Sequence, residues 1–78
     1  MRIKNIDDAA TVASMCAKYT ELEIDAKCAN RRYIVDAKSF MGLQMLVGGG
    51  AVTFTVIDPT KPGYQDFLRD VAELSRKL

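Results

Sequence analysis

The chain has 78 residues, with 11 basic and 10 acidic side chains and a net charge of +1 at pH 7. This length predicts one domain, residues 1–78, with a small hydrophobic core. The balanced charge excludes the basic surface of a nucleic-acid binder and the polybasic segment of a membrane-surface protein. No apolar run is long enough to cross a bilayer, and the first residues do not follow the pattern of a secretory signal. The sequence therefore predicts a cytoplasmic protein without a membrane or nucleic-acid partner.

The first half of the chain predicts a strand, a helix and a second strand. Residues 1–6 alternate apolar and polar side chains, which is typical of a short strand. Apolar side chains then recur at the three-and-four spacing of a helix over residues 8–19, and either Asp7 or Asp8 can cap its first turn. Residues 21–28 alternate strictly, so we expect a strand with one buried face.

The second half predicts two more strands and two helices. After a turn, residues 32–35 return as a third strand that forms a hairpin with the second. Ser39 begins a short helix to about residue 46, which a run of three glycines ends, and residues 52–56 form a fourth strand. A final amphipathic helix follows, and its expected inner face consists of Tyr64, Phe67, Leu68, Val71, Leu74 and Leu78.

The predicted order of elements is βαββαβα. One-sided strands with a polar outer face are typical of antiparallel sheets that are covered on one side only. The sequence therefore predicts an α+β domain, an open-faced sandwich with a four-stranded antiparallel sheet and three helices on one face.

The two cysteines are expected to be reduced thiols that pack in the core. Cys16 shares a helical face with apolar residues, and Cys28 continues the inward alternation of the second strand. A redox pair or a metal site is the alternative, but two thiols without a histidine do not complete a tetrahedral site. We therefore expect no metal and no cofactor.

The short helix that begins at Ser39 is the segment with the clearest functional signal. The Ser39 hydroxyl is placed to accept hydrogen bonds from the first helical turn, and a phosphate added there would lie at the positive end of the helix dipole. The helix is too short to bury all of its apolar side chains. We expect Phe40 or Met41, together with Met45, to stay partly exposed, while Leu43 or Leu46 enters the core.

The element order, together with the sequence Lys38-Ser39-Phe40-Met41-Gly42-Leu43, resembles the HPr family, the histidine-containing phosphocarriers of the bacterial phosphoenolpyruvate-dependent sugar phosphotransferase system. The resemblance extends from about residue 9 to residue 78 and is strongest over residues 35–56. In the family, the serine of this motif is the target of an ATP-dependent regulatory kinase, and by position that serine is Ser39.

The resemblance also implies partners and a binding surface. HPr-like proteins dock enzymes and transcriptional regulators on an apolar patch that the short helix and the first helix form. The expected partners are the serine kinase, a transcriptional regulator or enzymes of the phosphotransferase system, in carbon catabolite regulation. The residues of this chain that the resemblance places on the interaction surface are Phe40, Met41, Leu43 and Met45.

The same comparison removes the main activity of the family. HPr carries phosphate on a histidine at the start of its first helix, and this chain has no histidine. It has Asp7 and Asp8 in that region, and carboxylates there would repel a phosphoryl group and its donor. An acyl phosphate on Asp7 or Asp8 would need a cation held by further acidic residues, and none is near in sequence. We therefore expect both aspartates to be helix caps and the protein not to be an enzyme.

Two functional hypotheses follow. The first is an HPr-like regulatory or adaptor protein that is not competent for histidine phosphotransfer and is regulated at Ser39. The alternative is an interaction module with the HPr fold that is no longer linked to the phosphotransferase system. Such a module would have no need of Lys38 or of Met41 and Gly42. An enzymatic hypothesis is weakest, because no serine-histidine, cysteine-histidine or metal-ligand set can be assembled without histidine.

Overall fold

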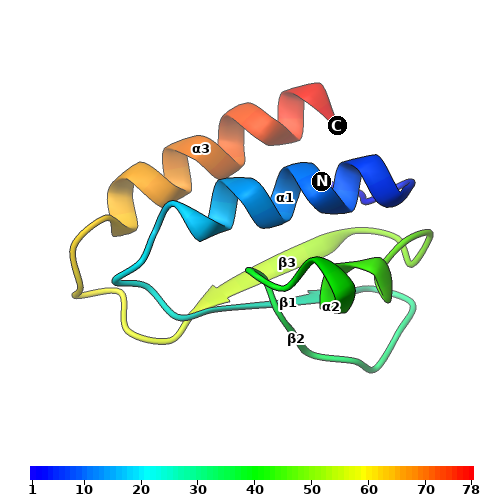
Figure 1. Ribbon diagram of the computed structural model, residues 1–78, viewed down its shortest axis with the longest axis horizontal. Coiled ribbons are helices and arrows are strands. Elements are labelled where there is room, and N and C mark those ends of the chain that lie inside the picture. Colours follow the sequence, from blue (N-terminus) through cyan, green and yellow to red (C-terminus); the bar gives the residue numbers. More distant parts are fainter.

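The structure is a computed structural model that describes all 78 residues. Figure 1 shows two long helices above an antiparallel sheet, with a short third helix beside the first. The elements in chain order are α1 (Ile6–Ala17), β1 (Ile24–Cys28), β2 (Val35–Asp36), α2 (Phe40–Gln44), β3 (Val52–Val56) and α3 (Tyr64–Lys77). The expectation of a mixed α+β domain is confirmed, whereas the sheet has three strands and not four.

The sheet has the order β2-β1-β3, and β1 pairs antiparallel with both neighbours. Ala26 in the centre of β1 lies opposite Val35 of β2 and Phe54 of β3. The side chains of β1 alternate as the sequence predicts, because Ile24, Ala26 and Cys28 are buried. The opposite face carries polar side chains, including Asp25 and Lys27, so one face of the sheet is left to solvent.

The first predicted strand is wrong, because residues 1–6 make only an isolated bridge between Arg2 and Ala51. Two backbone bonds tie this segment down: Val52 N–H donates to the Met1 carbonyl at 2.8 Å, and Gly48 N–H donates to the Ile3 carbonyl at 2.9 Å. The chain turns into α1 directly afterwards, so too few residues remain extended to make a ladder. The side chain of Ile3 is nevertheless buried in the core.

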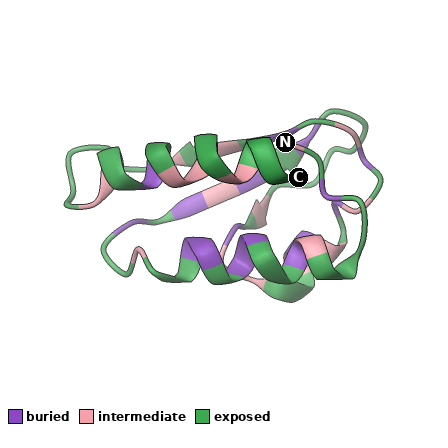
Figure 2. Ribbon diagram, turned by 90° about the horizontal axis from the view of Figure 1, so that it is seen from above, coloured by how far each residue is buried: buried purple, intermediate pink, exposed green.

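Helix α1 and helix α3 lie side by side over the sheet, and they differ in burial. Figure 2 shows buried and exposed residues alternating along α1, whereas most of α3 is exposed or intermediate. α1 buries Ala9, Val12 and Cys16 completely, but Phe67 is the only buried residue of α3. Leu68, which we expected on the inner face of α3, is 42% exposed.

Aromatic and polar contacts attach α3 to the rest of the fold. The ring of Phe67 meets Tyr19 and Phe54 edge-to-face, with centroids 5.4 and 5.9 Å apart. The Tyr19 hydroxyl donates to the Asp70 carboxylate, and the Lys18 amine forms an ion pair with the same carboxylate at 2.9 Å. α3 is therefore held through the buried Phe67 ring, through a cluster of polar groups at the C-terminal end of α1, and through the half-buried Val71 and Leu74, which pack against the core.

The remaining boundaries shift by a few residues from the predicted ones. The first helix starts at Ile6 and not at residue 8, because Asn5 caps it. The second strand begins at Ile24 and not at residue 21, although Leu22 is buried. The third strand, predicted over residues 32–35, is limited to Val35–Asp36. The last strand and the last helix are found where the sequence predicts them.

Both cysteines are free thiols buried in the core. Burial raises the pKa of the Cys16 thiol to about 12, although the nearby Lys38 amine opposes the shift. The predicted packing role of both residues agrees with their positions. None of the helices is both long enough and apolar enough to traverse a lipid bilayer.

Candidate functional site on helix α2

The start of α2 is fixed by Ser39. Its backbone is extended, at φ −91° and ψ 112°, and its Oγ accepts a hydrogen bond of 3.0 Å from Gly42 N–H. The Ser39 carbonyl accepts the first intrahelical bond, from Leu43 N–H, at 2.9 Å. This geometry confirms the predicted N-cap, and the Ser39 side chain stays partly exposed.

Two buried leucines hold α2 against the fold. Leu43 and Leu46 are completely buried, and both join the hydrophobic core. Gly42 lies where the helix approaches β2: a Cβ atom there would lie 3.1 Å from Val35 Cβ and 3.3 Å from Ser39 Oγ. Glycine at this position therefore allows close contact between α2 and the strand.

The outer side of α2 carries three large apolar side chains. Phe40 is 39%, Met41 79% and Met45 46% exposed, and we call these three residues the α2 surface. All three were predicted as interaction residues. The fourth, Leu43, lies in the core and is not part of the surface. An exposed methionine pair suits contacts that adapt to different partners, because its side chains are flexible and polarizable.

Helix α1 extends this apolar area. α1 contacts α2 along one flank, and Figure 1 shows α2 beside α1 on the side away from α3. Helical spacing places Ile6, Ala10 and Ala17 on the flank toward α2, since Met15 on the opposite flank meets α3. Ile6 is 57% exposed, and both alanines are exposed. None of these three side chains is charged.

Arg31 caps the other end of α2. Its Nη1 donates to the carbonyl of Met45 at 2.8 Å and to the carbonyl of Val47 at 2.9 Å. These are carbonyls that a helix end leaves without an intrahelical partner. Sequence reasoning missed this role, because Arg31 precedes Met45 by 14 residues and no local pattern links the two.

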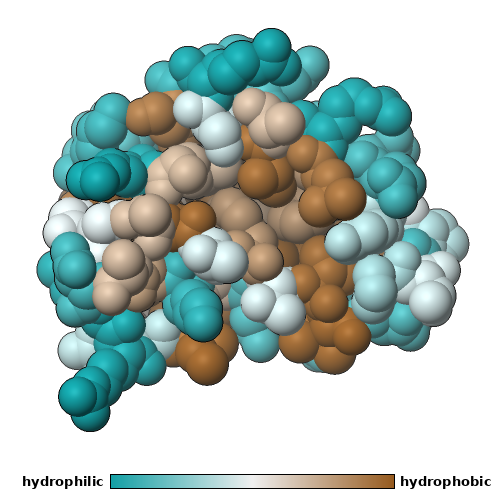
Figure 3. Space-filling view, turned by 180° about the vertical axis from the view of Figure 1, so that it is seen from behind, coloured by the Kyte–Doolittle hydropathy of each residue, from teal (hydrophilic) through white to brown (hydrophobic).

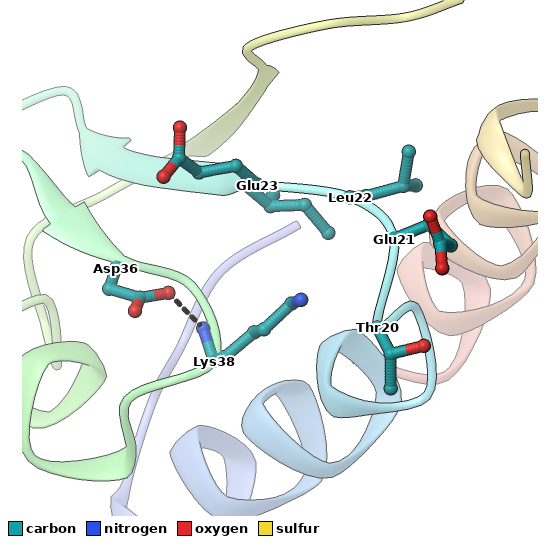
Figure 4. Close-up of a pocket in the computed structure, with 7 residues that line it drawn as sticks. Thr20, Glu21, Leu22, Glu23, Asp36 and Lys38 are labelled. Atoms are coloured by element: carbon teal, nitrogen blue, oxygen red, sulfur yellow. Dashed lines mark hydrogen bonds between the residues drawn. The ribbon is translucent and has the colours of Figure 1, made fainter. Parts of the chain in front are cut away.

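Lys38 links α2 to the end of α1. Its backbone N–H donates to Asp36 Oδ1 at 2.9 Å, and its amine donates to the Tyr19 carbonyl at 2.7 Å. Figure 4 shows Lys38 beside a hollow of about 290 Å³, with the carboxylates of Glu21 and Glu23 directed away from the amine. Lys38 therefore has a structural role, because it ties this segment to the end of α1. Gly42 has one too, because it allows α2 to approach β2. Neither residue distinguishes a regulated protein from an interaction module, contrary to the sequence argument.

Asp7 and Asp8 are not the N-cap of α1. Asn5 holds that position, and its Oδ1 accepts from Asp8 N–H at 2.9 Å. Asp8 is the third residue of the helix, and its Oδ2 accepts a hydrogen bond of 2.9 Å from Lys4 N–H. Both aspartates lie in the first turn, where their negative charge interacts favourably with the positive end of the helix dipole. No three His, Cys, Asp or Glu side chains come together to hold a metal ion.

Comparison with protein-family models, with curated proteins and with solved structures finds no match to this chain. The functional conclusion therefore depends on the geometry described above and on the resemblance of the sequence motif.

The charges around Ser39 limit what a phosphate could bind within the molecule. Lys38 directly precedes Ser39, and its amine donates to the Tyr19 carbonyl, whereas Arg31 lies at the other end of α2. Asp36 is three residues before Ser39, and Ser39 N–H donates to its carbonyl at 2.9 Å. A dianion on Ser39 would meet the amides of the first helical turn, with the Asp36 carboxylate three residues before it.

Proposed function

We propose that this protein is an HPr-like regulatory or adaptor protein that binds other proteins through the α2 surface. It is not competent for histidine phosphotransfer and does not act as an enzyme. The observation that carries the proposal is the exposure of Phe40, Met41 and Met45 on a helix whose base is fixed by Leu43. A rigid base under flexible apolar side chains is the arrangement that a docking surface requires.

Phosphorylation of Ser39 is the proposed regulatory step. The kinase transfers a phosphoryl group from ATP to the Ser39 oxygen, and the hydroxyl proton is released. The phosphate oxygens then replace the hydroxyl as acceptors for Gly42 N–H. The amine of Lys38 is directed to the Tyr19 carbonyl, and we propose that the partner supplies an arginine or lysine that neutralises the new charge. The proposed partner therefore has an apolar patch with a basic group beside it.

The fold supports the relation to the HPr family in its coarse features. Helices cover one face of an antiparallel sheet, and the Arg2 bridge lies beside β3, where a further strand would extend the sheet. A cytoplasmic location is part of the proposal.

A second candidate is an interaction module outside the phosphotransferase system. One observation favours it: Asp7 and Asp8 hold the place of the family's phosphate site. Both candidates use the α2 surface, and they differ in whether a kinase recognises Ser39.

Intact-mass measurement separates the two candidates. The purified protein is incubated with an HPr serine kinase and ATP, beside a Ser39→Ala control, and in parallel with enzyme I and phosphoenolpyruvate. We expect one phosphate in the kinase reaction, none in the control and none with enzyme I. A kinase reaction without phosphate would favour the interaction module, and phosphate transferred by enzyme I would contradict the loss of phosphotransfer.

A further inference from the structure

The outer edge of β3 is unpaired over most of its length. β3 pairs with β1 on one side, and on the other side its only strand-like contact is at its first residue, where Val52 N–H donates to the Met1 carbonyl. In an antiparallel ladder, successive residues point their N–H and C=O groups to opposite sides. Since the backbone groups of Val52 point outward, those of Phe54 and Val56 point outward too. They have no strand partner.

The inner side of the strand agrees with this assignment. Ala51 accepts a bond from Ala29 N–H through its carbonyl, and Ile57 N–H donates to the Glu23 carbonyl at 3.0 Å. The backbone N–H and C=O groups of the odd-numbered residues in β3 therefore point toward β1. The free edge consists of the backbone of Phe54 and Val56.

β3 lacks three features that block pairing in natural edge strands. Such strands usually carry a charged side chain, a proline or a bulge. β3 reads Val-Thr-Phe-Thr-Val, and the first charge and the first proline, Asp58 and Pro59, come after its end. The strand is therefore open to a further strand.

An apolar hollow lies directly above the edge. It has a volume of about 280 Å³ and lies between β3 and α3, where Phe54, Val56, Phe67, Leu68 and Val71 line it. In Figure 3, the view from behind, apolar side chains gather below a row of hydrophilic ones. The apolar area is therefore continuous from the edge strand to the helix.

The flank of α3 toward this edge carries no charge. Asp70 pairs with Lys18 on the side of α1, which fixes the orientation of the helix. Helical spacing then places Leu68, Ala72 and Ser75 on the opposite flank. Leu68 is 42% exposed there. An uncharged strand edge lies beside an uncharged helix flank.

We propose that this edge binds a second copy of the chain, with the two β3 strands antiparallel about a two-fold axis at Thr55. Phe54 of each copy lies opposite Val56 of the other, and the two residues exchange both backbone hydrogen bonds. All outward groups of Phe54 and Val56 are satisfied in this register. Thr55 meets Thr55 of the second copy on the polar face, and the Phe54–Val56 contact lies on the apolar face.

Two features of the molecule favour a second copy over another extended segment. Met1 occupies the place beside Val52, so an added strand can pair only from Thr53 onward. A two-fold axis at Thr55 centres two identical strands on the part of β3 that is free. The side chains of Thr53–Val56 and of the α3 flank also carry no charge, so these parts of two identical surfaces meet without side-chain repulsion. A two-fold axis would bring the Leu68 flanks of the two α3 helices toward each other.

Charge substitution at Thr55 tests the proposal by sedimentation equilibrium. Thr55 lies opposite Asp25 within one chain, so Thr55→Lys adds an attractive pair to the monomer. In the dimer it places two lysines face to face, which we expect to raise the dissociation constant about a hundredfold. Thr55→Val should leave dimerisation unchanged. A mixture of Thr55→Lys and Thr55→Glu proteins should form a heterodimer, and failure of the mixture to associate would overturn the proposed register.

Amide hydrogen exchange supplies the second test. The amides of Thr53, Thr55 and Ile57 should be protected at every concentration, because they face β1. The amides of Phe54 and Val56 should exchange rapidly in dilute protein and become protected as its concentration rises. A wild-type protein that stays monomeric, with both amides unprotected at the highest soluble concentration, would overturn the proposal. Dimerisation that is lost in Met41→Glu and retained in Thr55→Lys would also overturn it.

Discussion

The α2 surface and the β3 edge are both exposed and apolar, but they offer different groups to a partner. The α2 surface presents the side chains of Phe40, Met41 and Met45, while the backbone beneath them is satisfied within the helix. The β3 edge presents backbone N–H and C=O groups at Phe54 and Val56. A side-chain surface can adapt to several partners, whereas a strand edge accepts only an extended strand. One molecule therefore has one adaptable surface and one that is geometrically strict.

Removal of the buried leucine under α2 should have the largest effect. Leu43 is completely buried, so Leu43→Ala should lower the free energy of unfolding by about 2–5 kcal/mol. Urea unfolding followed by circular dichroism measures the loss. If α2 and the β3 edge are separate, the fraction that remains folded should still dimerise through β3. A loss of stability below 1 kcal/mol would show that Leu43 is not an anchor of α2.

Substitution on the α2 surface should reduce recognition without reducing stability. Met41 is 79% exposed, so Met41→Glu should change the free energy of unfolding by less than about 0.5 kcal/mol. With an HPr serine kinase as the probe, we expect kcat/KM for Ser39 phosphorylation to fall about tenfold, a loss of roughly 1.4 kcal/mol.

Leu68→Glu is the matched control for Met41→Glu. It also replaces an exposed apolar side chain by a carboxylate, but on the flank of α3 beside the β3 edge. We expect it to leave the kinase reaction unchanged and to weaken dimerisation. Equal losses of kinase activity in the two variants would show that recognition is not specific to α2.

Removal of the helix cap should have a smaller effect. Ser39→Ala loses the hydrogen bond from Gly42 N–H, and we expect about 1 kcal/mol of stability to be lost. Ser39→Asp keeps an acceptor at this place and should recover most of that loss in urea unfolding. Equal stability of the wild type and Ser39→Ala would mean that the α2 surface does not depend on its cap.

The pH dependence of stability should reveal how α3 is attached. The Tyr19 hydroxyl and then Lys18 lower the pKa of Asp70, so this contribution is present above the usual aspartate pKa and is lost as pH falls through the lowered one. Burial and the Asp70 carboxylate raise the pKa of Tyr19 from 10.0 to about 12, so its contribution is lost as pH rises between these values. Thermal unfolding across pH should show both losses. Tyr19→Phe should abolish the alkaline loss and reduce the acid one, and Asp70→Asn should abolish the acid loss and reduce the alkaline one.

The comparison of sequence and structure shows which signals are local. The N-cap at Ser39, the buried side of β1 and the helix at Tyr64 depend on neighbours in the chain, and the sequence predicts them. The strand at residues 1–6 fails, because alternation over so few residues does not reveal how soon Asn5 starts a helix.

Within the candidate site, the same distinction holds. The exposure of Met41 and Met45 follows from the number of apolar side chains on a short helix, which the sequence shows. The Arg31 cap and the Lys38 link join residues 14 or more positions apart, so only the fold reveals them. The sequence offers Leu43 or Leu46 as the core residue of this segment, and the structure buries both.

The two buried thiols give the molecule one reporter in α1 and one in β1. Cys16 belongs to α1, and Cys28 lies beneath Gly49, where a Cβ atom would meet its sulfur. A thiol reacts as the thiolate, so the raised pKa of Cys16 keeps it inert while the core is closed. Labelling rates at the two sites would therefore measure how often each part of the fold opens, without any introduced probe.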